Sequence, residues 1–507
     1  ENDHTIIFNW SSSIFDIISE LIIANESRKN PRIVIMSDRD KVEMEDEIAA
    51  KIADMKNSRI ICRSGDPTDL NDIAIVNPHT AQSIIVVAPE EDDADLRVIK
   101  TILALVHDPA RRTEPYRIAA ELREQPNADI ARVVGGAEVQ LVLADDLIAR
   151  IMVQSTRQPG LSGVFTELLD FDGCEIYTVD EPELAGLRFG DALLRYDEGT
   201  LIGIVDPSGE VALNPPMDRI IAPGTKAIVV AEDDDRIRLS AVPQDDAPAM
   251  IVGGPAPVVR SERTLLIGWN RRGSIVVEEL SRYATPGSLL TIAADGDEFS
   301  TEAIAPREQR GHLAVERRRV DTARASDIAA LDPTSYDSIL VLGYSDSLAA
   351  QAADTRTLIT LLHLRSAAEL AGMPINVVSE MIDVRNRALA EVTRVSDFVV
   401  SNKLVSLMLA QASENERVEA IFADLLSDEG SDICLRPVDD YATPGQAIPF
   451  KDIVRAARAR GEIAIGYRRT GQSGRLSGVV LNPPKAEILA FAPEDRIVIL
   501  QGTGRNG

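Results

Sequence analysis

Cysteine is scarce in this chain of 507 residues, with Cys62, Cys174 and Cys434 as its three members. Because they are odd in number and far apart, neither a disulfide framework nor a zinc site is expected, and a reducing compartment fits. Aromatic residues make up only 4% of the chain, so the cores must be built from aliphatic side chains. No apolar run reaches the ~18 to 20 residues of a membrane-spanning helix, and no signal peptide is recognisable.

Positive charge is also in short supply. The 53 Lys and Arg residues face 81 Asp and Glu residues, which gives a formal net charge of −28. Such a surface repels the phosphates of nucleic acids and anionic lipids, so neither is expected as a partner. The same charge favours solubility and can concentrate cations near the protein.

What the chain does contain is a duplication of one large unit. The run 5–10 (TIIFNW) returns at 264–269 (TLLIGW), the run 83–87 returns at 338–342, and Leu-Asn-Pro-Pro at 213–216 returns at 481–484. These matches are offset by 259, 255 and 268 residues. A nearly constant offset from end to end predicts two tandem copies of one fold. Paired copies of this kind usually belong to an assembly.

Short apolar strands that alternate with helices open each copy. In the first copy we expect strands at 5–9, 32–36, 59–63, 83–88 and 116–121, and in the second at 264–268, 289–293, 340–343 and 375–379. This alternation is typical of a parallel sheet with helices on both faces, the doubly wound α/β fold. A helical stretch from about Val139 to Gln154 is then expected to leave the first sheet. Short strands and frequent turns after each sheet predict a small α+β domain.

The predicted domains follow one another in this order. They are a first doubly wound domain at 1–138, an exit helix at 139–162, a small α+β domain at 163–240, a linker rich in Pro, Gly and Ala at 241–261, a second doubly wound domain at 262–402, an exit helix at 403–430 and a second small domain at 431–507.

The first turn of each doubly wound domain lacks the glycines that dinucleotide binding needs. That chemistry uses G-x-G-x-x-G, because the glycines let backbone amides approach a pyrophosphate. Residues 9–13 (NWSSS) have no glycine, and residues 268–273 (GWNRRG) keep only the outer two. We therefore expect the fold to be retained without NAD. Asp38 or Asp40 stands where a doubly wound domain would bind a ribose hydroxyl, but its simpler role is a helix cap or a cation ligand. The serines at 11–13 are candidate N-caps of the first helix.

Several stretches of the chain resemble one family of ion channels. They are 22–27 (IIANES), 60–67 (IICRSGDP), 133–136 (VVGG), 157–161 (RQPGL), 213–215 (LNP), 230–235 (VAEDDD), 395–402 (VSDFVVSN) and 463–468 (IAIGYR). They are similar to the cytosolic region of the CASTOR/POLLUX family and, more broadly, to RCK (TrkA-type) domains. The glycine-poor first turn also resembles this family rather than the NAD-binding TrkA subunits.

The resemblance implies a function that composition could not reveal. Family members carry a transmembrane pore ahead of two tandem RCK units, and four chains form a cytosolic gating ring of eight RCK units. The resemblance thus implies a homotetramer at the cytoplasmic face of a membrane, Ca²⁺ as the ligand, and a potassium- or calcium-permeable pore as partner. The Ala- and Arg-rich composition suits a bacterial member. The sequence starts at Glu1, just before a predicted strand, and we expect the pore to precede it.

Two runs of acidic residues are candidates for a Ca²⁺ site. Calcium takes six to eight oxygen ligands, often from clustered carboxylates and backbone carbonyls. The first run follows the fourth strand, at the edge where doubly wound sheets bind ligands, and the second ends the first small domain. The first run comprises Glu90, Glu91, Asp92 and Asp93, followed by Asp95, and the second comprises Glu232, Asp233, Asp234 and Asp235. Their simpler interpretation is a solvated loop or a helix N-terminus.

Two other functions stay open from the sequence. One is a soluble TrkA-type subunit that regulates a separately encoded potassium channel or transporter. The other is an NAD-dependent oxidoreductase, against which the missing glycines argue. No catalytic pattern is present, so an enzyme is not expected: Gly160-Leu161-Ser162-Gly163 departs from the G-x-S-x-G elbow, and the histidines have neither metal nor triad spacing. These histidines are His4, His79, His107, His312 and His363.

Overall fold

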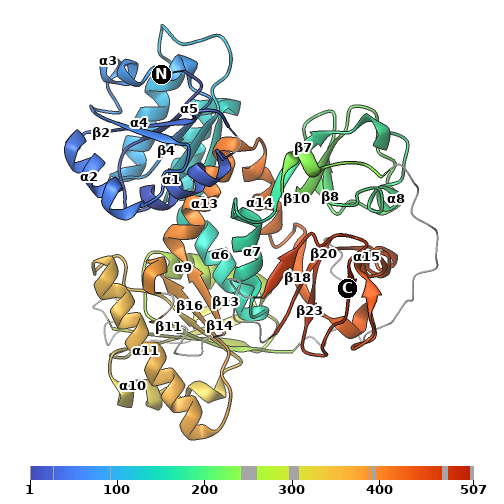
Figure 1. The fold of residues 1–507 in the computed structure, drawn as a ribbon. Helices are drawn as coiled ribbons and strands as arrows, with labels where there is room; N and C mark the ends of the chain where they lie inside the picture. Colours follow the sequence, from blue (N-terminus) through green and yellow to red (C-terminus); the bar gives the residue numbers. More distant parts are fainter. Residues whose placement is uncertain are drawn as a thin grey trace. The chain divides into compact units, whose positions relative to one another are not determined.

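The computed structural model describes residues 2–26, 28–91, 93–240, 260–295, 308–386, 389–390, 396–470 and 478–502. The chain divides into two compact units (Figure 1). Unit 1 comprises Glu1–Ile148, Leu169–Asp172 and Asn402–Glu419, and unit 2 comprises Ala149–Leu168, Gly173–Ser401 and Ala420–Gly507. Each unit therefore combines segments that are far apart in the sequence. The predicted linker at 241–261 lies almost wholly outside the described residues.

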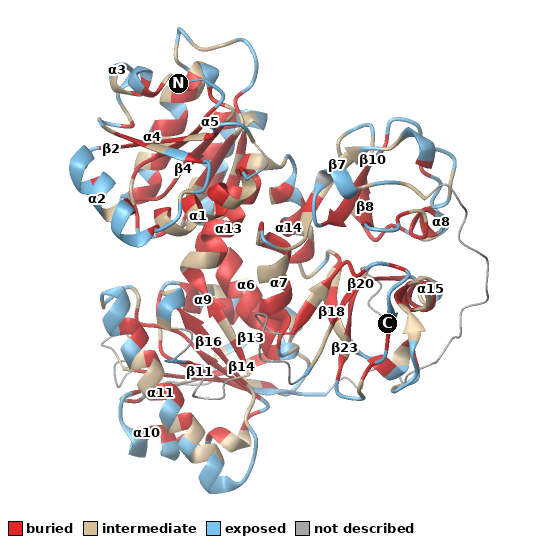
Figure 2. Cartoon of the chain, in the orientation of Figure 1, coloured by how far each residue is buried: buried red, intermediate tan, exposed pale blue. Residues whose placement is uncertain are grey.

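Unit 1 is built on a six-stranded parallel sheet of order β3-β2-β1-β4-β5-β6. Its strands are β1 Thr5–Phe8, β2 Arg32–Ser37, β3 Arg59–Ser64, β4 Ser83–Val86, β5 Ile118–Leu122 and β6 Val139–Leu143. Its helices are α1 Ile14–Ala24, α2 Lys41–Lys51, α3 Leu70–Ile73, α4 Ala94–Val106 and α5 Gln125–Gly135. The strands are buried and the outer helix faces are exposed (Figure 2). The order, which reverses between β1 and β4, confirms the doubly wound prediction.

Unit 2 contains a second sheet of the same plan, of order β13-β14-β12-β11-β15-β16-β17. Its strands are β11 Arg263–Ile267, β12 Ser288–Ala294, β13 Glu308–Arg310, β14 Leu313–Arg319, β15 Ser338–Val341, β16 Val377–Met381 and β17 Asp397–Val400. Its helices are α9 Arg272–Tyr283, α10 Ala325–Ala330 and α11 Ala350–Ala371. All neighbours are parallel except β13. The sequence prediction missed β14, because its Glu-Arg-Arg-Arg end carries no apolar alternation.

Two small sheets complete unit 2. The first C-lobe is the sheet β7-β10-β8-β9 with helix α8, and the second C-lobe is the sheet β18-β23-β20-β21 with helix α15. Their elements are β7 Glu175–Asp180, α8 Phe189–Ala192, β8 Thr200–Val205, β9 Val211–Leu213, β10 Lys226–Ala231, β18 Asp432–Pro437, α15 Phe450–Ala459, β20 Glu462–Arg468, β21 Val479–Leu481 and β23 Arg496–Gln501, with the ribbon β19 Ile448–Pro449 and β22 Ile488–Leu489. Asp206 stabilises the turn of the β8–β9 hairpin by accepting hydrogen bonds from the backbone N–H groups of Ser208 and Glu210.

The sequence predicted side-chain caps at the N-termini of α1 and α2, and the structure shows one of them. Asp40 caps α2 by accepting hydrogen bonds from the N–H groups of Val42 and Glu43, as proposed from the sequence. Ser13 stands at the N-cap of α1 without a side-chain capping bond, so the serine cap expected there is wrong. Its hydroxyl instead contacts that of Ser11 at 2.6 Å.

The predicted exit helix at 139–162 begins too early. Val139–Leu143 is the sixth strand of the sheet, and helix α6 starts at Ala144. No Gly or Pro separates the two elements, so the apolar pattern runs through the boundary. The acidic pair Asp145 and Asp146 in the first turn of α6 was the signal for the helix start. The second exit segment, predicted at 403–430, is two helices, α13 Ser401–Glu414 and α14 Val418–Leu425.

None of the helices in the described part of the chain is both long and apolar enough to cross a membrane. Cys62, Cys174 and Cys434 are free thiols.

Candidate functional site

The first acidic run is engaged in contacts within unit 1. Glu90 Oε1 accepts a hydrogen bond of 2.9 Å from the backbone N–H of Ser12, at the start of α1. Glu91 lies 3.6 Å from the guanidinium of Arg97 on α4. Asp93 is the N-cap residue of α4 and makes no side-chain capping bond, and Asp92 lies outside the described residues. These contacts stabilise the loop without any ligand.

The second acidic run lies at the end of the first C-lobe, where Glu232, Asp233 and Asp235 are exposed. Glu232 pairs with Arg236 at 3.0 Å, one helical turn away. Among the described residues, no three His, Cys, Asp or Glu side chains are grouped as a metal site requires. The eight carboxylates predicted as calcium ligands, which include Asp234, therefore stay a prediction.

In both copies, a carboxylate of the chain occupies the place where a doubly wound domain would bind a phosphate. In unit 1 this contact joins Glu90 to the N–H of Ser12. In unit 2, Asp346 Oδ2 accepts from the N–H of Arg271 at 2.5 Å, and Arg271 is the counterpart of Ser12 at an offset of 259. Backbone amides at this turn attract anions, and in both copies one of them donates to a side-chain carboxylate of the chain.

An Arg–Asp ion pair recurs at the end of the second strand in both copies. Arg97 on α4 pairs with Asp38 at 2.7 Å, and its counterpart Arg356 on α11 pairs with Asp295 at 2.6 Å. Burial alone would raise the pKa of Asp38, but the hydrogen bond and charge of Arg97 hold that pKa below its usual value. In unit 2, Arg356 also lies 4.4 Å from the ring centre of Tyr344.

A glutamate stands on the strand that follows β4 or β15 in each copy, half-buried in the first copy and buried in the second. Glu380 on β16 is 1% exposed, pairs with Arg272 and accepts from the N–H of Gly343 at 3.1 Å. Its counterpart Glu121 on β5 accepts from the N–H of Ala88 at 3.0 Å. Burial raises the pKa of Glu121 to about 7, against the hydrogen bond from Ala88. The sequence analysis did not single out either residue, because each is one acid within an apolar strand.

The exit helices form two hairpins, and part of each hairpin belongs to the unit that holds the sheet of the other copy. The first hairpin is α6 Ala144–Arg157 with α7 Leu161–Leu169, and the second is α13 with α14. Residues 149–168 of the first hairpin are part of unit 2, and residues 402–419 of the second hairpin are part of unit 1. The two copies therefore exchange most of the first hairpin and helix α13 of the second.

A buried glutamate holds the exchanged hairpin in each unit. In unit 1, Glu20 on α1 pairs with Lys403 on α13. In unit 2, Glu279 on α9, the counterpart of Glu20, lies 3.4 Å from Arg150 on α6. Both glutamates are only 2% exposed. A carboxylate buried to this degree needs a cation beside it, so each pair joins a hairpin to a foreign sheet domain.

The last strand of each sheet holds the turn of the exchanged hairpin. Asp397 on β17 accepts from the N–H groups of Gly160 and Ser162 at 2.9 and 3.2 Å, and also from the Ser162 hydroxyl. Its counterpart Gln140 on β6 donates to the carbonyls of Ala412 and Asn415 at 2.6 and 3.0 Å. Asp397 and Gln140 occupy corresponding positions of the duplication. Each copy therefore holds the hairpin turn of the other copy from its own last strand.

The two C-lobes pair through the repeated Leu-Asn-Pro-Pro motif. Asn214 Nδ2 donates to the carbonyl of Gly461 at 3.0 Å, and Asn482 Nδ2 donates to the carbonyl of Glu198 at 2.8 Å. Both asparagines have positive φ, 37° and 47°, a conformation that Asn tolerates better than most residues. The motif thus joins the lobes by two matching hydrogen bonds (the lobes are the right-hand domains of Figure 1).

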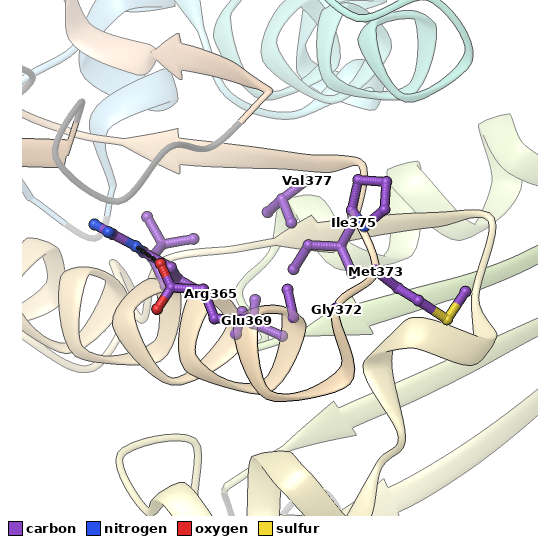
Figure 3. A pocket seen from close by; sticks show the side chains of 10 residues that line it. Arg365, Glu369, Gly372, Met373, Ile375 and Val377 are labelled. Carbon is purple, nitrogen blue, oxygen red and sulfur yellow. Dashed lines mark hydrogen bonds and ion pairs between the residues drawn. The ribbon is translucent and has the colours of Figure 1, made fainter.

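One cavity of about 350 Å³ opens between α11 and the start of β16 in unit 2 (Figure 3). Its lining is mainly apolar, and an ion pair of 2.8 Å between Arg365 and Glu369 stands among the lining residues. Leu361, Leu364 and Val377 form its buried wall. None of the residues proposed from the sequence lines this cavity.

Comparison with known proteins finds similar sequences among ion channels. Residues 145–246 match the family model described as "Castor and Pollux, part of voltage-gated ion channel". The chain is 31% identical over 527 residues to "Ion channel CASTOR" of Lotus japonicus, with 96% of this chain and 60% of that protein covered. It is 29% identical over 541 residues to "Probable ion channel POLLUX" of Arabidopsis thaliana, with 99% and 64% covered.

The chain is a relative of the CASTOR and POLLUX proteins along nearly its whole length. It spans about 60% of the length of these relatives. The fold is shared more widely, because the gating ring of human SLO3 superposes with a TM-score of 0.69 over 100% of both chains, at 14% identity. The prediction of two tandem RCK units, each a doubly wound domain followed by a small domain, is therefore confirmed as a fold.

Proposed function

We propose that this chain is the ligand-sensing gating ring of a cation channel and that it regulates the pore through lobe rearrangement. The observation that carries this proposal is the match of 96–99% of the chain to relatives named as ion channels. A homotetramer at the cytoplasmic face of a membrane, forming a ring of eight RCK units, is part of the proposal. The pore would be either another segment of the same protein or a separate protein.

The exchanged hairpins supply a mechanical basis for this function. Each hairpin is anchored by a buried ion pair and by a turn contact, so a change in one copy is transmitted to the sheet domain of the other. A ligand shifts such an equilibrium only by its different affinities for the two states. Binding would therefore favour one lobe angle and place tension on the pore.

Calcium is the proposed ligand. The acidic runs at 90–93 and 232–235 supply hard oxygen ligands, and the net charge of −28 raises the local cation concentration. We propose that backbone carbonyls complete the coordination, since Ca²⁺ commonly takes carbonyl oxygens as ligands.

The alternatives use the same fold differently. A soluble TrkA-type subunit would bind a separately encoded potassium channel or transporter with the same ring. An NAD-dependent oxidoreductase is disfavoured, because the first turns of both copies lack the glycines of the dinucleotide motif, and their amides at Ser12 and Arg271 donate to Glu90 and Asp346.

Calorimetric titration of the chain with CaCl₂, with MgCl₂ as control, tests the proposal. We expect saturable heat with Ca²⁺ and none with Mg²⁺, because Mg²⁺ demands stricter geometry and dehydrates reluctantly. The double variants Glu91→Gln/Asp93→Asn and Asp233→Asn/Asp235→Asn then assign the heat to one run. Absence of heat with both ions would reject calcium sensing by this chain, and heat on titration with NAD would favour one of the two NAD-binding alternatives, the TrkA-type subunit or the oxidoreductase.

A further inference from the structure

The paired C-lobes are nearly symmetric, but their two halves differ at one buried contact. Gly203 on β8 and Gly466 on β20 correspond, since a Cβ at either would lie within 2.6 Å of a carbonyl of the neighbouring strand. Thr200 therefore corresponds to Ile463. The offset of the Leu-Asn-Pro-Pro motif likewise places Lys485 at the position of Met217. The pair Lys485 and Thr200 is thus polar, whereas the corresponding pair in the other half, Met217 and Ile463, is apolar.

The polar half is a chain of hydrogen bonds that starts from a buried amine. Lys485 is 2% exposed, and its Nζ donates to Thr200 Oγ1 of the first C-lobe at 2.7 Å. Thr200 Oγ1 in turn donates to Asn482 Oδ1 at 2.8 Å. In the other half, where Ile463 replaces the threonine, Asn214 Oδ1 has no partner within the described part of the chain.

Few groups around Lys485 can compensate a positive charge. The titratable groups that face it are Cys174, just before β7, and Asp197, in the loop before β8. From α15 it meets the ring of Phe450, at 5.8 Å from Nζ to the ring centre, and the backbone N–H of Lys451, which donates to the Lys485 carbonyl at 2.9 Å. Burial also raises the pKa of Cys174, to about 12, so its thiol stays neutral and offers no counter-charge.

We propose that Lys485 is a proton-controlled latch between the two C-lobes, closed when its amine is neutral and loosened when it is protonated. A neutral amine needs few acceptors, and Thr200 supplies one. An ammonium has three donors, and leaving them buried without acceptors disfavours the paired lobes. The latch goes beyond calcium sensing and does not depend on it, because no residue of the two acidic runs takes part.

The direction in which pH changes the stability follows from the direction in which burial shifts the pKa of Lys485. Burial lowers the pKa of Lys485 from its usual range to about 7, with the charge of Asp197 opposing the shift. An unfolded lysine titrates near ~10.4. Between these two values the unfolded chain binds more protons, so the stability contributed at this site rises with pH from about 7 to about 10. Below pH 7 both states are protonated and the lower stability is constant.

Thermal unfolding of the full chain between pH 6 and pH 9.5 tests the latch. Lys485→Met installs the residue that the other copy carries at Met217, and should raise the Tm at pH 7 by several degrees. It should also flatten the rise in Tm between pH 7 and pH 9. The matched control is Lys226→Met, an exposed lysine of the first C-lobe, which should keep the pH profile of the parent chain. An unchanged profile in Lys485→Met would overturn the proposal.

A second measurement follows the lobes directly. Spin labels at Ile220→Cys and Ile488→Cys, two exposed positions in different lobes, report the distance between the lobes by pulsed electron resonance. We expect a broader distance distribution at pH 6 than at pH 9, and the same distribution at both values when Lys485→Met is added. Thr200→Val, which removes the acceptor, should broaden the distribution further at pH 6. Distributions independent of pH in the parent chain would reject the latch.

Discussion

Replacing Lys403 by Met is expected to destabilise unit 1 by about 3 kcal/mol at pH 7, because breaking a buried ion pair leaves an uncompensated charge. Glu20 is 2% exposed, and its Oε2 already has no partner among the described residues. Burial raises the pKa of Glu20, and the charge of Lys403 is the largest effect opposing that rise. Without Lys403 the pKa of this carboxyl would rise further, because that charge would no longer oppose the effect of burial. Urea unfolding of the variant, followed by hydrogen exchange in α1 and α13, measures the loss.

Two further variants make this result specific to the pair. Glu20→Leu combined with Lys403→Met should recover most of the lost stability, because two well-packed apolar side chains can replace a buried ion pair. Lys41→Met is the control, since Lys41 pairs with Glu45 at 3.5 Å on the exposed face of α2. Exposed pairs of this kind contribute about 0.3 to 0.5 kcal/mol. Equal losses in Lys403→Met and Lys41→Met would mean that Lys403 does not anchor the hairpin.

Replacing Asp397 by Ala is expected to release the turn of the first hairpin, at a cost of about 3 kcal/mol in unit 2. The substitution leaves the N–H groups of Gly160 and Ser162, and the Ser162 hydroxyl, without their acceptor. Asp397 is 8% exposed, and unsatisfied donors at such depth cost about 1 to 3 kcal/mol each. Hydrogen exchange at the Gly160 and Ser162 amides should accelerate about 100-fold, in line with ~1.4 kcal/mol for each factor of ten.

The corresponding position of the other copy is the natural control for this substitution. Gln140→Ala removes neutral hydrogen bonds to the carbonyls of Ala412 and Asn415. Neutral bonds contribute less than bonds to a charged group, so Gln140→Ala should destabilise unit 1 by about 1 kcal/mol. Asp397→Asn, which removes the charge and keeps the shape, should fall between the two. If Asp397→Ala destabilises the protein no more than Gln140→Ala does, the charge of Asp397 does not contribute to holding the hairpin turn.

Much of the architecture could be predicted from short stretches of sequence. The apolar strands near Thr5, Ser83 and Ser338 lie where the prediction placed them, because a buried parallel strand is a continuous apolar run. Asp40 was identified as a cap from its position alone. The prediction was wrong at Val139, where strand β6 passes into helix α6 without a turn residue. Local sequence signals therefore predict the boundary between a strand and a helix only where a turn residue separates the two elements.

The sequence by itself determined that one α/β unit occurs twice and that each copy ends in a small domain, because periodicity and turn chemistry act over neighbouring residues. Only the tertiary structure decided which surfaces meet. The pairing of Glu20 with Lys403 spans 383 residues, and that of Lys485 with Thr200 spans 285. At that separation, partner choice depends on the packing of whole domains. A lysine after two prolines therefore looked like an ordinary loop residue until the fold buried it.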